Sequence, residues 1–200
     1  MKDGVKVITP NPKTSGAARW NYLAAWAYAE KKFDKNETKV KEFIRALFQN
    51  IPVLDSGARG STITFAQRGL GDVLLAWENE AYLAQDEFGN DKFEIISPPT
   101  SILAEPPVAV VTKVAGKRST YDIAREYLQY LFTDAGQAII EKHHYRPRIS
   151  SAAASHPLPK ISFVGIDHFG GWRAAQKNIL MTGAPLTKST RNRQFISYGH

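Results

Sequence analysis

Three short segments of the sequence place small or hydrogen-bond-donating residues where a strand is expected to pass into a helix. They are Thr14-Ser15-Gly16-Ala17, Ser56-Gly57-Ala58-Arg59-Gly60-Ser61 and Ala76-Trp77-Glu78-Asn79. Small residues let a ligand approach backbone N–H groups closely, and helix N-termini present unpaired N–H donors with a partial positive charge. Such a set of neutral donors is suited to a fully ionised oxyanion.

Two side chains extend this donor set. Ser15 would add a hydroxyl and Trp77 an indole N–H, which is a donor only. Each also has an ordinary structural interpretation, because Ser15 stands where a helix N-cap belongs and a single Trp is more often a core residue. The three segments together favour an anion site, but they do not specify which anion.

The elements that must position these segments alternate between strands and helices. Apolar spacing and turn residues predict strands at about 5–8, 52–54, 72–77, 93–96 and 108–111, and helices at about 17–32, 37–50, 61–68, 78–85, 121–132 and 135–143. Repeated strand–turn–helix units indicate an α/β fold with a mostly parallel sheet. In such sheets the ligand crevice lies at the carboxyl ends of the strands.

Composition excludes several classes of protein. The 200 residues include no cysteine, which excludes a disulfide scaffold, a thiolate metal site and a cysteine nucleophile. No apolar run is long enough to span a membrane, and residues 1–13 lack the apolar stretch of a signal peptide. The net charge of +7 belongs entirely to residues 101–200, and its basic residues form no stripe on one helix, so no nucleic-acid partner is expected.

An enzyme is the least favoured alternative. The carboxylates that could serve an enzyme are Asp55, Asp72, Glu78 and Glu80. We interpret them instead as groups at helix starts or on the surface. The sequence has no G-x-S-x-G elbow and no P-loop, and the adjacent His143 and His144 do not share a helix face. We therefore expect no catalytic residues, no cofactor and no metal.

Longer motifs around the three segments resemble the periplasmic sulfate-binding protein family. These motifs are ITPNPKTSG at 8–16, LDSGARG at 54–60, GDVLLAWENE at 71–80, SILAEPPV at 101–108 and FGGW at 169–172, and the resemblance covers about residues 5–177. It implies a monomeric, periplasmic substrate-binding component of an ABC importer, which delivers sulfate or thiosulfate to a membrane permease. The implied fold is periplasmic binding protein-like, with two α/β lobes, parallel or mixed sheets and the anion in the cleft.

The resemblance also implies a role for each candidate site residue. Ser15 would donate its hydroxyl to sulfate, Gly16, Ala17 and Ala58 their backbone N–H groups, and Trp77 its indole N–H. The family holds the dianion without a cationic side chain in contact, so Arg19 and Arg59 are expected behind the site or on the surface. A shell made only of donors rejects a protonated oxyanion, because the proton needs an acceptor.

Two departures from the family pattern lead to further expectations. The first lobe is expected to be incomplete, with residues 1–95 forming the second, anion-binding lobe and 96–177 the crossover and C-terminal part of the first lobe. Residues 178–200 are expected to be a non-family tail, and codons for 183–190 can be realigned to encode a family-like ending, which suggests a frameshift. The alternative to a sulfate-binding module is therefore a nonfunctional fragment of one.

Overall fold

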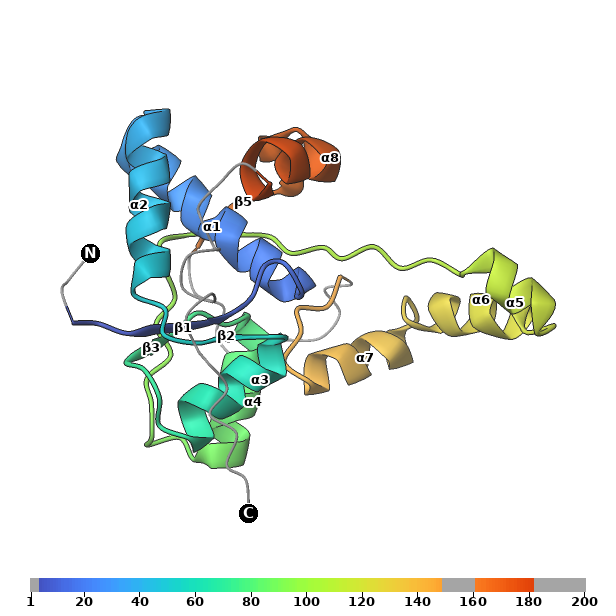
Figure 1. Ribbon diagram of the computed structural model, residues 1–200. Coiled ribbons are helices and arrows are strands. Elements are labelled where there is room, and N and C mark those ends of the chain that lie inside the picture. Colours follow the sequence, from blue (N-terminus) through green and yellow to red (C-terminus); the bar gives the residue numbers. More distant parts are fainter. Residues whose placement is uncertain (1–3, 149–160, 182–200) are drawn as a thin grey trace, which may run out of the picture.

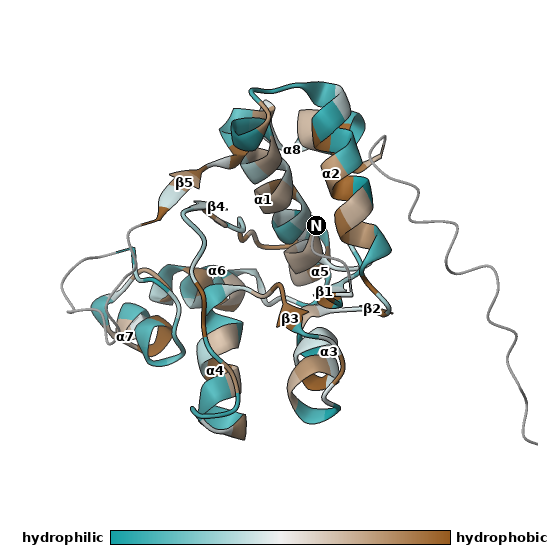
Figure 2. Cartoon of the chain, turned by 90° about the vertical axis from the view of Figure 1, so that its left-hand side faces the viewer, coloured by the Kyte–Doolittle hydropathy of each residue, from teal (hydrophilic) through white to brown (hydrophobic). Residues whose placement is uncertain are grey.

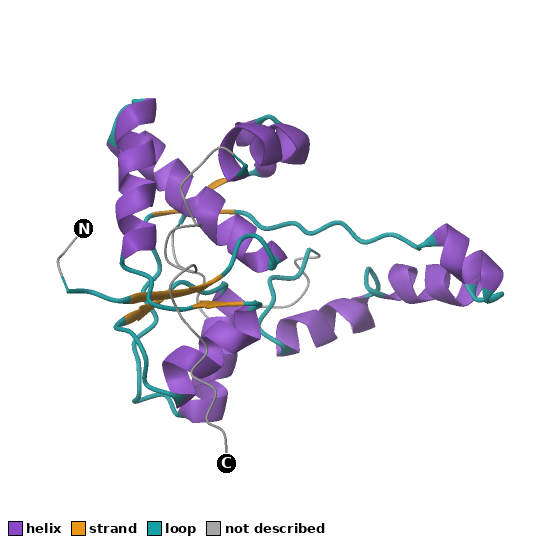
Figure 3. Ribbon diagram, viewed as in Figure 1, coloured by secondary structure: helices purple, strands orange, loops and turns teal. Residues whose placement is uncertain are grey.

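The computed structural model describes residues 4–148 and 161–181, and helices make up most of this part (Figure 3). Of the predicted tail at 178–200, residues 178–181 are described, and the rest, including the proposed frameshift at 183–190, lies outside the described residues. The elements follow in the order β1 (Val7–Pro10), α1 (Gly16–Lys32), α2 (Glu37–Gln49), β2 (Leu54–Asp55), α3 (Ala58–Thr62), η1 (Ile63–Gln67), β3 (Val73–Leu74), α4 (Glu78–Phe88), β4 (Thr100–Ile102), α5 (Thr112–Lys117), α6 (Tyr121–Tyr130), α7 (Asp134–Lys142), β5 (Ser162–Val164), η2 (Ile166–Phe169), α8 (Gly171–Ala175) and η3 (Gln176–Leu180).

A three-stranded parallel sheet, in the order β2-β1-β3, forms the centre of the molecule. Thr9 pairs with Leu54 on one side of β1, and Ile8 pairs with Leu74 on the other side. Helices α1 and α2 lie on one face of this sheet and α3 and α4 on the other (Figure 1). The central strand β1 is buried between the two helical layers, whereas β2 and β3 are only partly buried. The predicted α/β class with parallel sheets is confirmed.

The hydrophobic core lies mainly between α1 and α2. Leu23 and Trp26 on α1 pack with Ile44 on α2, and Phe169 and Ile179 from the C-terminal helices join the same cluster. Helix α2 carries both hydrophobic and hydrophilic residues, as the brown and teal of Figure 2 show, because one side faces this core and the other faces solvent. Helix α1 is therefore the element on which the rest of the fold packs.

A second parallel sheet consists of β4 and β5, in which Thr100 pairs with Ser162. It packs on α1, and the Lys31 ammonium donates to the Thr100 hydroxyl at 3.3 Å. The strands expected at 93–96 and 108–111 were wrong, because both segments are loops. Their apolar residues have the local pattern of a strand, but within residues 4–148 and 161–181 no neighbouring strand pairs with them.

Helices α5, α6 and α7 form an arm, residues 103–143, which projects from the rest of the molecule (Figure 1). An extended segment at 103–111 connects β4 to α5 without secondary structure of its own. In the described residues, no helix has the length and apolarity that crossing a bilayer requires.

Tyr22 is a buried titratable group in the core. Its ring lies between Trp26 and Phe48, with centroid separations of 6.3 Å and 5.4 Å. Among the described residues its hydroxyl has no hydrogen-bond partner, and burial raises its pKa to about 12. The neutral phenol is therefore strongly preferred in the folded state.

This burial predicts a loss of stability at alkaline pH. Tyr22 ionises near pH 10 when unfolded and near 12 when folded, so its contribution is complete below about pH 10 and is lost progressively up to about pH 12. Between pH 8 and pH 11.5 the free energy of unfolding should fall by about 2–3 kcal/mol more in the unchanged chain than in Tyr22→Phe. Urea denaturation at the two pH values measures this difference. The exposed Tyr145→Phe is the control, and an equal effect of both changes would contradict the prediction.

Candidate anion-binding site

Three helix N-termini meet at one edge of the central sheet. Strand β1 leads into α1, β2 into α3 and β3 into α4, and the three strands are parallel neighbours. Their carboxyl ends therefore lie on the same side of the sheet, as Figure 1 shows. This topology brings together the three segments that the sequence singled out.

Ser15 is the N-cap of α1. Its backbone is extended, with φ −115° and ψ 126°, and its hydroxyl oxygen accepts from the Ala18 N–H at 3.3 Å. The residue is only 7% exposed, and within residues 4–148 and 161–181 the hydroxyl donates to no acceptor. The hydroxyl proton is thus left for a further acceptor, while Gly16 opens the helix beside it.

The start of α3 has no side-chain cap. Gly57 is its N-cap, with extended backbone, and α3 continues directly into the π-helical turn η1. Asp55 fixes this turn, because its carboxylate accepts from the Ser61 hydroxyl at 3.3 Å and the Thr64 hydroxyl at 3.2 Å. The Ala58 N–H therefore belongs to a helix start that is held in place without a side chain covering it.

Trp77 is the N-cap of α4 and connects that helix to α1. Its indole N–H donates to the Ala17 carbonyl oxygen at 3.3 Å. The sequence-based expectation directed this N–H toward an anion, whereas in the structure it is hydrogen-bonded within the protein. An anion at this place would compete with a backbone carbonyl for the indole N–H.

A small pocket brings three of the five candidate residues together. Ala17, Ala58 and Trp77 all line it, whereas Ser15 and Gly16 precede it along the chain and do not line it. The remaining lining residues are Pro10, Asn21, Ser61, Thr62, Leu74, Leu75, Ala76 and Glu80. Lys and Arg are absent from this lining and its one charged side chain is the Glu80 carboxylate, so any positive potential in the pocket comes from the helix N-termini.

The two nearby arginines are used elsewhere. Arg19 donates from Nε to the Pro12 carbonyl at 3.1 Å, which braces the loop before α1. Arg59 forms an ion pair with Glu87 near the end of α4. Their positions agree with the expectation that they stand behind the site or on the surface.

The carboxylates that an enzyme would need also have structural partners. Asp72 accepts from the Lys6 backbone N–H at 2.7 Å, and Glu80 accepts from the Thr62 hydroxyl at 3.1 Å. Glu78 binds Arg146 through two hydrogen bonds, of 2.6 Å and 2.8 Å. Over the described ranges, no three His, Asp or Glu side chains gather as a metal site would require.

Sequence reasoning missed Asn21. Its amide donates to the Leu75 carbonyl at 2.9 Å and to the Thr9 hydroxyl at 3.2 Å, so it ties α1 to β1 and to the end of β3. It also lines the pocket. The sequence does contain one indication of this role. Asn21 is a single amide within the apolar run of α1, and a buried polar side chain requires a hydrogen-bond partner.

Comparison with known proteins decides the family. The profile of the bacterial extracellular solute-binding protein family matches residues 1–146. The chain belongs to this family. The family is one of solute-binding proteins and not of enzymes, in agreement with the expectation from the motifs.

The relatives of this solute-binding chain include proteins for two related anions. The sulfate-binding protein of Escherichia coli K12 is 55% identical over 194 residues, covering 96% of this chain and 59% of the relative. The thiosulfate-binding protein of Pseudomonas aeruginosa is 46% identical over 186 residues, covering 92% of this chain and 56% of the relative. The predicted resemblance to sulfate-binding proteins is confirmed, and the chain spans about three fifths of their length.

A solved structure supports the same relationship. The sulfate-binding protein SubI from Mycobacterium tuberculosis H37Rv is similar with a TM-score of 0.65 and 25% identity. The similarity covers 88% of this chain and 60% of SubI. The solute-binding chain thus has the fold of the corresponding part of SubI.

The Arg146–Glu78 pair yields a prediction about how the start of α4 is held. The guanidinium also lies 5.1 Å from the centre of the Phe163 ring, so Arg146→Met loses both contacts. The free energy of unfolding should fall by about 1 kcal/mol, measured by urea denaturation. Arg125→Met breaks only an exposed 3.5 Å pair with Asp122 and should change stability by less than about 0.5 kcal/mol. Equal losses of unfolding free energy in the two variants would show that the Arg146–Glu78 pair stabilises the fold no more than an exposed ion pair does.

Proposed function

We propose that this chain carries an anion-binding half-site for sulfate or thiosulfate. The observation that supports this most directly is the convergence of Ala17, Ala58 and Trp77, from three helix starts, on one pocket without a lining cation. Helix N-termini attract anions through unpaired N–H groups and the helix dipole. Relatives named for sulfate and thiosulfate binding agree with this chemistry.

The proposed binding mode uses neutral donors only. The Ser15 hydroxyl and the N–H groups of Gly16 and Ala17 donate from the start of α1, and the Ala58 N–H donates from α3. The Trp77 indole exchanges its bond with the Ala17 carbonyl for one to the anion. A shell of donors favours sulfate over phosphate, whose proton needs an acceptor. This preference requires that the Glu80 carboxylate, which lines the pocket and accepts from Thr62, makes no contact with the anion.

The proposed biological role follows the relatives. We propose that a protein containing this chain acts in the bacterial periplasm and delivers its anion to the membrane permease of an ABC importer. The division into an anion-binding lobe at 1–95 and a crossover with part of the other lobe at 96–177 stays a prediction, as does the monomeric state.

Titration with anions tests the proposal against the alternative of a nonfunctional fragment. Calorimetry of the purified chain should show millimolar binding of sulfate and thiosulfate, because this half-site supplies donors from one side only. Phosphate at pH 7 should bind at least tenfold more weakly. The absence of heat with all three anions at millimolar concentration would favour the nonfunctional fragment.

A matched pair of N-cap variants separates binding from folding. Ser15→Ala and Asn36→Ala each remove a side-chain cap, on α1 and α2 respectively, and each should lower the free energy of unfolding by about 1 kcal/mol. Only Ser15→Ala should weaken sulfate binding, by about tenfold or more, which corresponds to about 1.4 kcal/mol. If both variants bind sulfate equally well, the role assigned to the Ser15 hydroxyl is wrong.

A further inference from the structure

An open hollow of about 680 Å³ lies between α1 and the C-terminal helices α8 and η3. Ala17 and Asn21 of α1 line the anion pocket, whereas Arg19, two residues from each of them, lines this hollow. The pocket and the hollow therefore lie on different faces of one helix. The other residues that line the hollow follow one another closely in the sequence, and they are Trp172, Arg173, Gln176, Lys177 and Met181.

The aromatic wall of the hollow has a well-defined position. Gly170 and Gly171 have φ angles of 74° and 80°, and this tight turn leads into α8. The ring of Trp172 then packs edge-on against the buried Trp20 of α1, with their centroids 4.6 Å apart. The hollow is thus held by the packing of α8 on α1.

Three cations line the hollow without an acidic partner. Arg19 donates from Nε to the Pro12 carbonyl, and the side chains of Arg173 and Lys177 are exposed. Over residues 4–148 and 161–181 none of the three cations forms an ion pair, and the lining includes no Asp or Glu. The hollow therefore carries a positive potential that no lining side chain neutralises.

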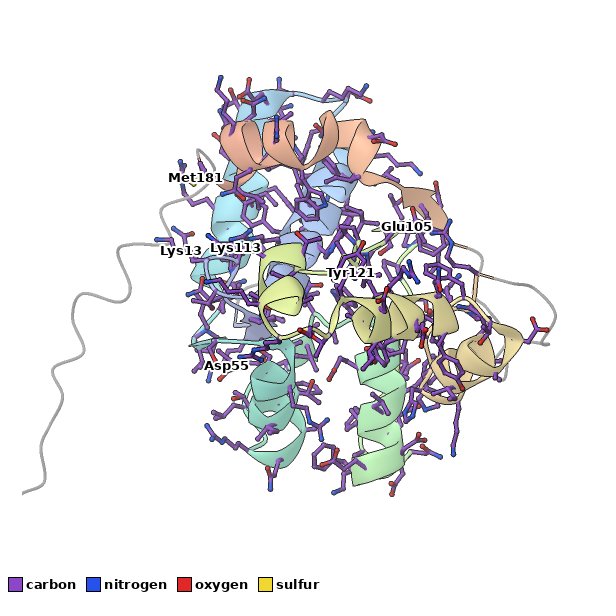
Figure 4. The ribbon with its side chains drawn as sticks, turned by 90° about the vertical axis from the view of Figure 1, so that its right-hand side faces the viewer. Lys13, Asp55, Glu105, Lys113, Tyr121 and Met181 are labelled. Carbon is purple, nitrogen blue, oxygen red and sulfur yellow. The ribbon has the colours of Figure 1, made fainter. Side chains whose placement is uncertain are left out.

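The lining has the composition of a protein-binding surface. Arg, Trp and Met are enriched at protein interfaces, and Trp and Arg are common among the residues that dominate binding energy. Met181, at the end of the C-terminal helices and at the margin of the molecule in Figure 4, is 74% exposed. Met181 and Trp172 offer apolar contacts beside the three cations, which fits a segment that combines acidic and apolar side chains.

The segments of this chain outside the described residues have the wrong charge to fill the hollow. Residues 149–160 and 182–200 contain no Asp or Glu, and residues 1–3 contain a single acid, Asp3. Residues 182–200 carry three further cations, which like charge would repel from the hollow. Charge complementarity therefore favours a separate partner.

The number of cations favours a protein over other polyanions. Proteins that bind duplex DNA commonly make about six to ten phosphate contacts. Basic clusters that recognise anionic membranes contain about four to eight Lys or Arg residues. Three cations around an apolar centre suit a few carboxylates with apolar neighbours instead.

We propose that this hollow is the docking site for an acidic segment of a separate protein. Carboxylates of that segment pair with Arg19, Arg173 and Lys177, and its apolar side chains pack on Trp172 and Met181. Because the anion pocket lies on another face of α1, docking needs no bound anion. The docking site is therefore independent of the proposed anion-binding function.

A labelled acidic peptide tests the proposal. The probe is a fluorescent ten-residue peptide in which Glu and Asp alternate with Leu and Phe, and its control peptide has Gln and Asn in place of the acids. Fluorescence anisotropy in sulfate-free buffer should give a Kd below about 1 mM for the acidic peptide, at least tenfold tighter than for the control. Equal binding of the two peptides, or no binding of the acidic one, overturns the proposal.

Matched charge reversals locate the surface. Arg173→Glu with Lys177→Glu should weaken binding of the acidic peptide at least tenfold. Lys113→Glu with Lys117→Glu reverses two cations at the same spacing on α5 and changes the net charge equally, so it should leave binding nearly unchanged. All four positions are exposed, so circular dichroism of each variant should match that of the unchanged chain. An equal loss of binding in the two variants would reveal only a general attraction to a basic protein and would contradict the proposal.

Two other polyanions serve as competing occupants in the same assay. A short DNA duplex and vesicles containing phosphatidylserine should each bind the α8–η3 variant and the α5 variant equally, because a diffuse attraction depends on net charge. If the loss of DNA or vesicle binding is confined to the α8–η3 variant and exceeds its loss of peptide binding, the hollow serves a nucleic acid or a membrane and the proposal is wrong.

Discussion

The parallel pairing of β1 with both β2 and β3 is the constraint on which the rest of the structure depends. Parallel neighbours end at the same edge, so each following helix must start there. The register places Pro10 beside Asp55 and Ile8 beside Leu74, which sets the positions of α1, α3 and α4 relative to one another. Reversing either pairing would move one helix start to the opposite edge and remove its N–H groups from the pocket.

Specific side-chain contacts then convert this topology into one site. The Thr14 hydroxyl donates to the Ser56 carbonyl at 3.0 Å, joining the first and second loops. Asn21 joins α1 to the end of β3, and Trp77 joins the start of α4 to Ala17. Each loop is therefore held by its neighbours, and the pocket keeps its shape without a bound charge. A cationic side chain buried in its place would carry a large desolvation cost whenever the site was empty.

The sequence predicted the parts that depend on local signals. The N-cap at Ser15, the helices with a regular apolar spacing and the glycine-containing turn before α3 all follow from short patterns of residues. The second sheet could not be found in this way, because Thr100 pairs with Ser162 far along the chain, and an apolar run such as 93–96 becomes a strand only if a partner lies beside it. The bond from Trp77 to Ala17 is similarly non-local, so the type of donor can be predicted from the sequence but its partner cannot.

The contacts of Arg146 connect the start of α4 with the second sheet. Its guanidinium donates to Glu78, the residue that follows Trp77, and lies 5.1 Å from the centre of the Phe163 ring on β5. Because Glu78 directly follows Trp77, these contacts hold the start of α4 against the second sheet, and the position of the indole depends on a side chain nearly seventy residues further along the chain.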